Sequence, residues 1–174
     1  MLSRNETVMH FLLNRRSRPA KTLSTPIPKQ DELLELLSAG ARTPDHGKLV
    51  PWRFIVLQEK TLSKLGSLVE KIGVKDSIPE DKIAKAKKQL ENGHLAVAVI
   101  EVQRDSEKIP SIEQTYSAGA VCLALLNAAL AAGWGANWLT GWHVYNKEFL
   151  KSGLDLKDNE SVAGLIYMGT ASIT

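Results

Sequence analysis

The chain has 174 residues, a length that suits one domain spanning residues 1–174. Its hydrophobic content of 44 % and charged content of 24 % are ordinary for a soluble globular protein and exclude a disordered chain. The net charge is only +3. Nucleic-acid binders usually carry a long basic stripe with interleaved aromatic residues, and this sequence has none, so we expect no nucleic-acid partner.

The first half of the chain, read in order, predicts two helices and a strand. Asn5 is expected to cap a helix that ends near Asn14, and three prolines make residues 15–28 an extended loop. Residues 30–42 have the amphipathic pattern of a second helix, which should end before Pro44. The run 52–57 has the composition of a strand.

The second half of the chain mixes helices and strands. We expect helices over 61–71, 80–91, 111–132 and 146–152, with a mobile linker over 73–79. The apolar run 95–102 is typical of a central strand buried on both faces, and 162–168 should be the last strand. Because strands and helices do not alternate regularly, the pattern favours an α+β layered domain rather than a doubly wound sheet.

The second half of the longest predicted helix, residues 118–132, is apolar nearly all round. It is interrupted by Gly119 and Asn127 and is too short for a membrane span, which needs roughly 20 apolar residues. A helix that is apolar on every side must be buried on every side. In so small a protein a second copy of the chain is the simplest cover, and burial within the monomer is the alternative.

The single cysteine, Cys122, lies in an apolar run, where a thiol behaves as a small inert hydrophobic group. One cysteine forms no intrachain disulfide, which is typical of a reducing compartment. The N-terminal residues lack the long apolar core of a secretory signal. We therefore expect a cytoplasmic protein.

Several common kinds of catalytic site are excluded by the sequence. No Gly-x-Ser-x-Gly segment is present, so a nucleophile elbow has no support. The four histidines are far apart in sequence and form no His-x-x-x-His pair, so we expect no metal site. The pair Gly133-Trp134-Gly135 follows a helix, which is the wrong context for a dinucleotide-binding fingerprint.

Three segments have the chemistry of a binding site. Arg15, Arg16 and Ser17 offer two guanidinium groups and a hydroxyl at the exit of the first helix, which suits a phosphate. Basic residues at a helix C-terminus also satisfy the helix dipole, so a solvated basic face is the alternative. In the second segment, Arg42, His46 and Lys48 offer donors to an electron-rich ligand edge, and the alternative is an ordinary turn that Asp45 caps.

The third segment is Gly133 to Trp142, in which three tryptophans recur every four residues. Its three glycines argue against a continuous helix. Small, glycine and aromatic residues in alternation would let the backbone approach a planar ring closely. The alternative is that the tryptophans fill the core beneath a turn.

In this order, the segments resemble the nitroreductase family, specifically its short bacterial members. The matching stretches are Asn14-Arg15-Arg16-Ser17, residues 39–46 with Pro51-Trp52-Arg53-Phe54, residues 117–120, Gly133-Trp134-Gly135, Trp138-Leu139-Thr140-Gly141 and residues 164–170. The resemblance implies a three-layer α/β/α sandwich with a mixed, mainly antiparallel sheet. It also implies a homodimer that binds FMN at its interface.

The resemblance further assigns roles to individual residues. Arg15, Arg16 and Ser17 would hold the phosphate and ribityl end of FMN, while Arg42 and His46 would contact the flavin bound to the other subunit. Thr140 and Gly141 would bring backbone N–H groups to the reactive flavin nitrogen, with Trp138 and Leu139 beside them. No catalytic side chain is required. NAD(P)H would reduce FMN, and a nitroaromatic, quinone or similar acceptor would then take the electrons in a ping-pong cycle.

This sequence departs from the family pattern in two places. Many members have Ser-x-x-Asn and a glutamine before the Pro-Trp pair, where this chain has Asp45, His46, Lys48 and Val50. Family chains also usually continue beyond the Gly-Thr turn, here Gly169-Thr170, into a tail that embraces the partner. With an end at Thr174 we expect fewer contacts to the partner or the phosphate. A flavin-binding storage protein without turnover is therefore the alternative function.

Overall fold

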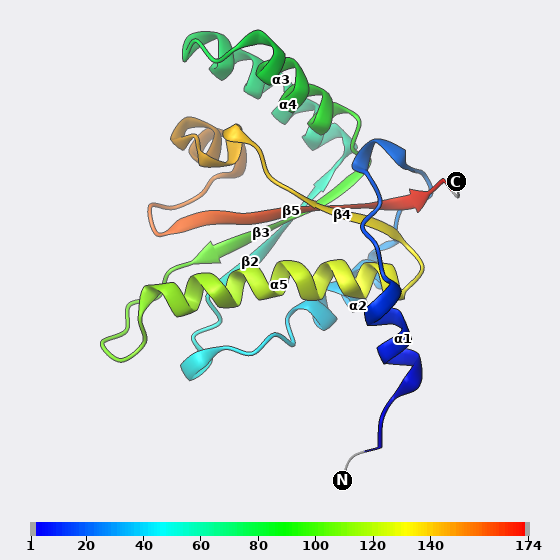
Figure 1. Ribbon diagram of the computed structural model, residues 1–174. Coiled ribbons are helices and arrows are strands. Elements are labelled where there is room, and N and C mark those ends of the chain that lie inside the picture. The colour runs from blue at the N-terminus through cyan, green and yellow to red at the C-terminus, as the bar shows by residue number, and fades with distance from the viewer. Residues whose placement is uncertain (1–2, 173–174) are drawn as a thin grey trace.

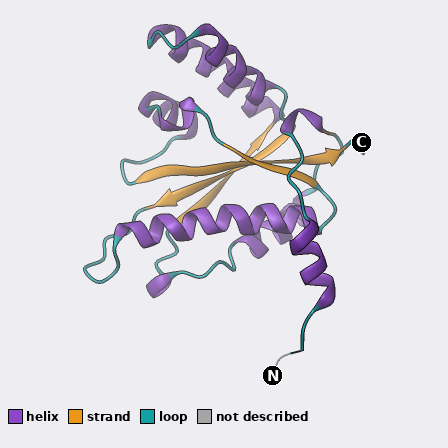
Figure 2. Ribbon diagram, viewed as in Figure 1, coloured by secondary structure: helices purple, strands orange, loops and turns teal. Residues whose placement is uncertain are grey.

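A five-stranded antiparallel sheet lies between two layers of helices in the computed structural model, which describes residues 3–172 (Figures 1 and 2). The first two and last two residues lie outside the described residues, and the expectation about the chain end at Thr174 falls there. The strands are β1 (Leu23–Ser24), β2 (Trp52–Gln58), β3 (Leu95–Val102), β4 (Gly135–Leu139) and β5 (Glu160–Ala171). Strand β5 pairs with β1, β3 and β4, and β2 pairs with β3; all these pairings are antiparallel.

Strand β3 shows why the sheet is covered on both faces. All eight of its residues are buried. Ala96, Ala98 and Ile100 pack in one hydrophobic cluster with α3 (Glu59–Lys75) and α4 (Glu80–Glu91). The alternate residues Leu95, Val97 and Val99 pack in the other cluster with α2 (Gln30–Gly40) and α5 (Ser111–Ala131). This period of two confirms the predicted strand and the expected α/β/α sandwich.

The first helix, α1 (Glu6–Asn14), begins and ends where the sequence predicts. The side chain of Asn5 caps it by accepting a hydrogen bond from the Val8 N–H at 3.1 Å. No residue of α1 is buried, and Figure 1 shows the helix beyond one end of the sheet layers. Three 3₁₀ turns, η1 (Ala20–Thr22), η2 (His46–Lys48) and η3 (Trp142–Tyr145), and a π-helical turn, η4 (Phe149–Gly153), complete the fold.

One local prediction is wrong, and a second is confirmed as a capped helix but differs in helix type. The segment expected to be a mobile linker is an extension of α3 followed by a hydrogen-bonded turn, in which Ile78 N–H donates to the Gly73 carbonyl oxygen at 2.9 Å. Gly73 is buried there because α3 and α4 pack closely: a Cβ at this position would meet Ile83. In the predicted helix over 146–152, Asn146 does cap the Phe149 N–H, but the end of the segment is a π-helical turn.

The last strand, β5, extends further than predicted, so the turn expected at Gly169-Thr170 is absent. Gly169 and Thr170 lie within β5, where Thr170 pairs with Ser24 of β1 and Gly169 pairs with Gly135 of β4. A Cβ at position 169 would meet the Ser24 carbonyl oxygen, so glycine serves close strand packing here rather than a turn.

Helix α5 is buried on only one side within a single chain. The buried side faces the sheet and includes Val121, Cys122 and Leu125, each with no exposed surface. The other side exposes apolar residues: Ile112 is 51 % exposed, Tyr116 68 % and Leu123 45 %. Among the described residues, α5 is the one helix long and apolar enough to cross a membrane. Helices that pack on the core of a folded domain pass the same test of length and composition. The expectation that it is covered on every side is not met by one chain alone.

Candidate functional site

The arginine segment after α1 runs beside β4, the start of which follows α5 through Gly133. Arg18 N–H donates to the Ala136 carbonyl oxygen at 2.9 Å, which ties the segment to the strand. One terminal nitrogen of Arg15, Nη2, donates to Ser17 Oγ at 3.3 Å. The backbone of the segment therefore lies along the sheet edge, where Arg15 is half-buried and Arg16 and Arg18 are exposed.

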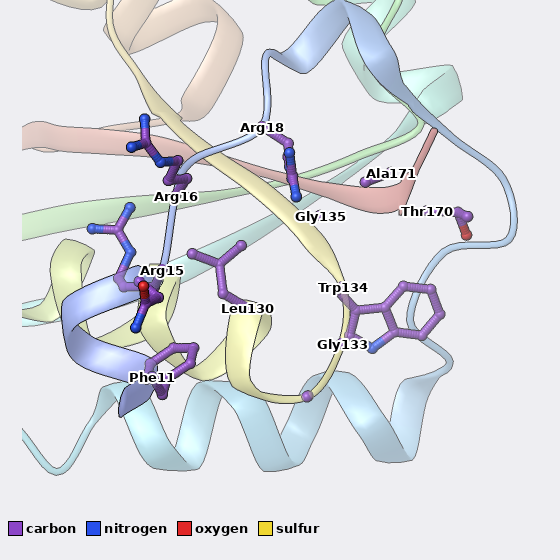
Figure 3. Close-up of a pocket in the computed structure, with 12 residues that line it drawn as sticks. Phe11, Arg15, Arg16, Arg18, Leu130, Gly133, Trp134, Gly135, Thr170 and Ala171 are labelled. Atoms are coloured by element: carbon purple, nitrogen blue, oxygen red, sulfur yellow. The ribbon is translucent and has the colours of Figure 1, made fainter. Parts of the chain in front are cut away.

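These arginines line one side of a cavity of about 550 Å³ at the end of the sandwich, opposite Trp134 and Thr170 (Figure 3). Its walls come from the end of α1, the end of α5, the start of β4 and the end of β5: Phe11, Asn14, Arg15, Arg16, Arg18, Leu130, Ala132, Gly133, Trp134, Gly135, Thr170 and Ala171. A second hollow beside it is lined by residues 13–17 and includes Ser17. The cavity thus combines apolar walls with a cationic mouth.

The positive charge of this cavity is not neutralised by the chain. Among residues 3–172, no ion pair involves Arg15, Arg16 or Arg18. The Arg15 Nε–H is buried and has no hydrogen-bond partner. A buried charged donor without an acceptor costs free energy, so this arrangement favours an anion that supplies the acceptor.

The second predicted segment forms a tight turn with unusual backbone geometry. Asp45 Oδ2 accepts a hydrogen bond from the Val50 N–H at 2.6 Å. Gly47, Lys48 and Val50 all have positive φ, and at the β-branched Val50 this conformation is a genuine outlier. The carboxylate of Asp45 therefore holds a strained turn closed. The capped-turn interpretation of Asp45 is supported in this modified form, and Arg42 lies exposed at its entry.

This turn is attached to the first half of α5. Ser117 Oγ donates to the Pro44 carbonyl oxygen at 2.6 Å, and His46 Nδ1 lies 2.6 Å from Glu113 Oε2. The arginine cavity, in contrast, touches Leu130 and Gly133 at the other end of α5. A helix of 21 residues spans about 30 Å. Figure 1 shows η2 and the arginine segment near opposite ends of α5, so one chain does not bring His46 to Arg15, Arg16 and Ser17. Arg42 lies between these regions, since Gly40, two residues before it, packs beside Leu125 in the second half of α5.

The third segment forms β4 and the turn after it. Trp138 and Leu139 end the strand, and Thr140 and Gly141 follow it without regular structure. Trp138 is 37 % exposed, and its indole covers the position that a Cβ at Gly164 would occupy. Trp138 is therefore a surface side chain that packs over Gly164. The alternative, in which the tryptophans fill the core, does not hold for this residue.

His143 lies directly beneath Gly141. A Cβ at Gly141 would be 2.8 Å from His143 Cε1, and the imidazole also packs edge-on against Phe149. Neither ring nitrogen of His143 has a hydrogen-bond partner. Burial lowers the pKa of His143 to about 4, so the ring is neutral near pH 7.

The single thiol, Cys122, is buried between α5 and the sheet. Burial raises the pKa of Cys122 to about 12, which makes the thiol inert as expected. Within residues 3–172, no group of three or more His, Cys, Asp or Glu side chains gathers as a metal would require.

Some residues of this region were not predicted individually. Thr170 and Ala171 reach the cavity because β5 is longer than its apolar run, a result of strand pairing that a local pattern does not encode. Arg18 belongs to the basic cluster after α1, and Trp134 and Gly135 belong to the third segment, so the composition of these segments was the available signal.

The fold and the cavity define an α+β sandwich with an unneutralised cationic cavity between the end of its first helix and the edge of its sheet. The model of the family described as the nitroreductase family matches residues 12–170. The chain belongs to the nitroreductase family, as its motifs predict.

Individual relatives agree with this assignment. The Escherichia coli protein named "Putative NAD(P)H nitroreductase YdjA" is 28 % identical over 165 residues, which cover 95 % of this chain and 88 % of that protein. The crystal structure of a nitroreductase-like family protein from Bacillus cereus covers 100 % of this chain and 90 % of its own, with a TM-score of 0.78 and 20 % identity. A nitroreductase from Desulfovibrio desulfuricans, solved in complex with FMN, has a TM-score of 0.76 at 18 % identity and covers 98 % and 89 %.

Proposed function

We propose that this protein is an FMN-dependent oxidoreductase that takes hydride from NAD(P)H and reduces nitroaromatic, quinone or similar acceptors in a ping-pong cycle. The proposal rests on family membership and, above all, on the unneutralised arginine cavity with its unpartnered Arg15 Nε–H. The similar fold of the Desulfovibrio desulfuricans protein, which binds FMN, supports the choice of ligand.

The chain's residues fit a phosphorylated planar ligand. Arg15, Arg16 and Ser17 would hold the phosphate, since each charge-assisted hydrogen bond contributes about 1.5–3 kcal/mol. Trp138 and Leu139 end the strand to which Arg18 is tied, and Thr140 and Gly141 follow it, so these residues would continue the same edge toward the ring. Backbone N–H groups of Thr140 and Gly141 would face the reactive end, while Arg42 and His46 would favour negative charge on it.

The site is completed by a second copy of the chain. The exposed apolar side of α5 needs a cover, and the arginine cavity lies at the end of α5 while Pro44 and His46 contact its first half. Two α5 helices packed antiparallel would bring Arg42 and His46 of one subunit to the arginine cavity of the other. Gly119 allows close approach, because a Cβ there would meet no atom within 4 Å in a single chain.

When bound, FMN accepts a hydride and passes on two electrons, so the protein needs to supply orientation rather than an acid or base. The reduced nicotinamide loses two electrons and one proton as that hydride, and the acceptor takes two electrons with protons from solvent. The turn after β4 would position the donor against the ring, and the apolar dimer interface would exclude water from it.

The experiment is a visible absorption spectrum of the purified protein before and after NADH or NADPH, followed by nitrofurazone. We expect a yellow protein that bleaches with the donor and recovers with the acceptor. A colourless protein that does not quench the fluorescence of added FMN would contradict flavin binding. Bound flavin that neither nicotinamide bleaches would instead identify a flavin-storage protein.

A further inference from the structure

The η2 turn places a histidine against a carboxylate of α5. His46 Nδ1 lies 2.6 Å from Glu113 Oε2. An ionised carboxylate only accepts hydrogen bonds, so Nδ1 carries a hydrogen and donates it. The other ring nitrogen, Nε2, makes no hydrogen bond among residues 3–172, and the His46 side chain is 62 % exposed. Glu113 therefore orients an imidazole whose Nε2 is open to a molecule beside it.

The backbone on both sides of His46 is held in place as well. Ser117 Oγ donates to the Pro44 carbonyl oxygen at 2.6 Å, which fixes the chain just before the turn to α5. Gly47, the next residue, packs so closely against Ile109 that a Cβ at this position would meet that side chain. A group that transfers a proton must be held at a fixed position, and these contacts supply that support.

His46 and Glu113 line an open cavity of about 550 Å³ between η2 and α5. Its α5 wall includes Tyr116 and Ala120, both of which belong to the exposed side of the helix. The proposed dimer covers this side with a second α5, and antiparallel packing sets the end of that helix beside the first half of this one. The cavity therefore faces the region in which the proposed function places the acceptor.

The acceptors of the proposed function consume protons as well as electrons. A quinone, for example, gains a hydride and one proton and becomes a hydroquinone. We propose that His46 is a catalytic residue that passes this proton to the acceptor, and that Glu113 is the positioning residue that orients its ring. The N–H bond at Nε2 of the protonated ring breaks, an O–H bond forms on the acceptor, and the imidazole regains a proton from solvent.

This inference adds a proton relay to the proposed function and rests on it, because it assumes an acceptor beside a flavin at the dimer interface. The hydride step itself uses neither residue as an acid or base. Solvent remains the source of the proton, and His46 is the group that delivers it. The pair is thus expected to affect only acceptors whose reduction includes a proton.

The test compares His46→Gln with a matched control, His94→Gln. His94 Nδ1 also lies near a carboxylate, 3.4 Å from Glu59 Oε2, but His94 does not line the cavity. Stopped-flow absorbance would follow the reoxidation of NADH-reduced, FMN-saturated protein by 1,4-benzoquinone and by ferricyanide. Benzoquinone takes up a proton with its electrons, whereas ferricyanide takes electrons alone. The ratio of the two rates therefore isolates the proton transfer from flavin binding and flavin reduction.

We expect His46→Gln to lower the benzoquinone-to-ferricyanide ratio by about 100-fold, because a general acid contributes about 10²–10⁴-fold to a rate. His94→Gln should leave the ratio at its wild-type value. Glu113→Gln should lower the ratio by about 10-fold, and it should add nothing to His46→Gln in the double variant, because it acts through the same imidazole.

NMR of the purified, ¹⁵N-histidine-labelled protein tests the pair without turnover. At a pH where the ring is neutral, nitrogen chemical shifts should place the His46 hydrogen on Nδ1 in the wild type, and Glu113→Gln should lose this preference. An unchanged rate ratio in His46→Gln would overturn the inference, and so would a wild-type ring without the Nδ1 hydrogen. Failure of the proposed function would appear separately, as wild-type protein that binds no flavin or that neither nicotinamide reduces.

Discussion

At the scale of single residues, Arg15 provides the main evidence for an anion site. Its Nη2 is oriented by Ser17, its Nε–H is buried without a partner, and no carboxylate neutralises it in the described residues. We expect Arg15→Ala to weaken FMN binding by roughly 10- to 100-fold, because one or two charged hydrogen bonds are lost. Quenching of FMN fluorescence measures this. Arg4→Ala is the control, because Arg4 lies outside the cavity. If Arg15→Ala bound FMN as tightly as this control, Arg15 would not belong to the site.

His143 makes a prediction about stability and pH. Its folded-state pKa of about 4 lies below the ordinary value of 6.5, so the unfolded chain binds the proton more tightly. The contribution of the neutral ring to stability is therefore fully present above pH 6.5 and is lost as pH falls toward 4, by about 3 kcal/mol in total. Urea unfolding of wild type and His143→Leu over this range measures it. An equal loss in the variant would show that another group is responsible.

At the scale of elements, the packing of α3 on α4 depends on a glycine. A Cβ at Gly73 would lie 2.5 Å from Ile83 Cγ1. We expect Gly73→Ala to destabilise the fold by about 1–3 kcal/mol through overpacking. In the double variant Gly73→Ala/Ile83→Ala, the total cost should be smaller than the sum of the two single costs, because the clash is absent. Chemical denaturation measures the unfolding free energy of each variant. If the losses of the two single variants simply added in the double variant, this packing would be contradicted.

Local sequence patterns predicted most elements but not their extents. The continuous apolar run of β3 and the Asn5 cap depend on neighbouring residues, so they were predicted correctly. The length of β5 depends on β1, which is more than 140 residues away along the chain. The continuation of α3 through Gly73 depends on Ile83, because tertiary packing outweighs the weak helix propensity of glycine.

The candidate site was predictable in composition and not in geometry. The basic segment after α1 and the glycine-tryptophan segment were recognised as binding chemistry, and both adjoin the arginine cavity. That Pro44 and His46 are attached to the first half of α5 depends on Ser117 and Glu113, and no local pattern specifies those contacts. The separation of the two half-sites therefore became visible only in the fold.

At the scale of the whole molecule, the exposed apolar side of α5 predicts association. Leu123 is 45 % exposed in a single chain, and we expect Leu123→Glu to convert a dimer to monomers that bind FMN poorly, because a charge would be buried at the interface. Sedimentation velocity with flavin absorbance measures both effects. Leu34→Glu is the matched control, since Leu34 is 55 % exposed on α2. A Leu123→Glu variant that stays dimeric with full flavin would place the interface elsewhere.

The central claim is that one FMN is shared between Arg15 of one subunit and Arg42 of its partner, and a mixed dimer tests it most directly. Chains carrying Arg15→Ala and chains carrying Arg42→Ala are differently tagged, co-expressed and purified as the mixed species, and FMN binding is titrated. If the site is shared, each mixed dimer has one doubly altered site and one intact site. We therefore predict wild-type affinity at half the wild-type stoichiometry, while both parent homodimers bind weakly. A mixed dimer with no tight site would contradict the account, because each subunit would then have to bind FMN with its own Arg15 and Arg42.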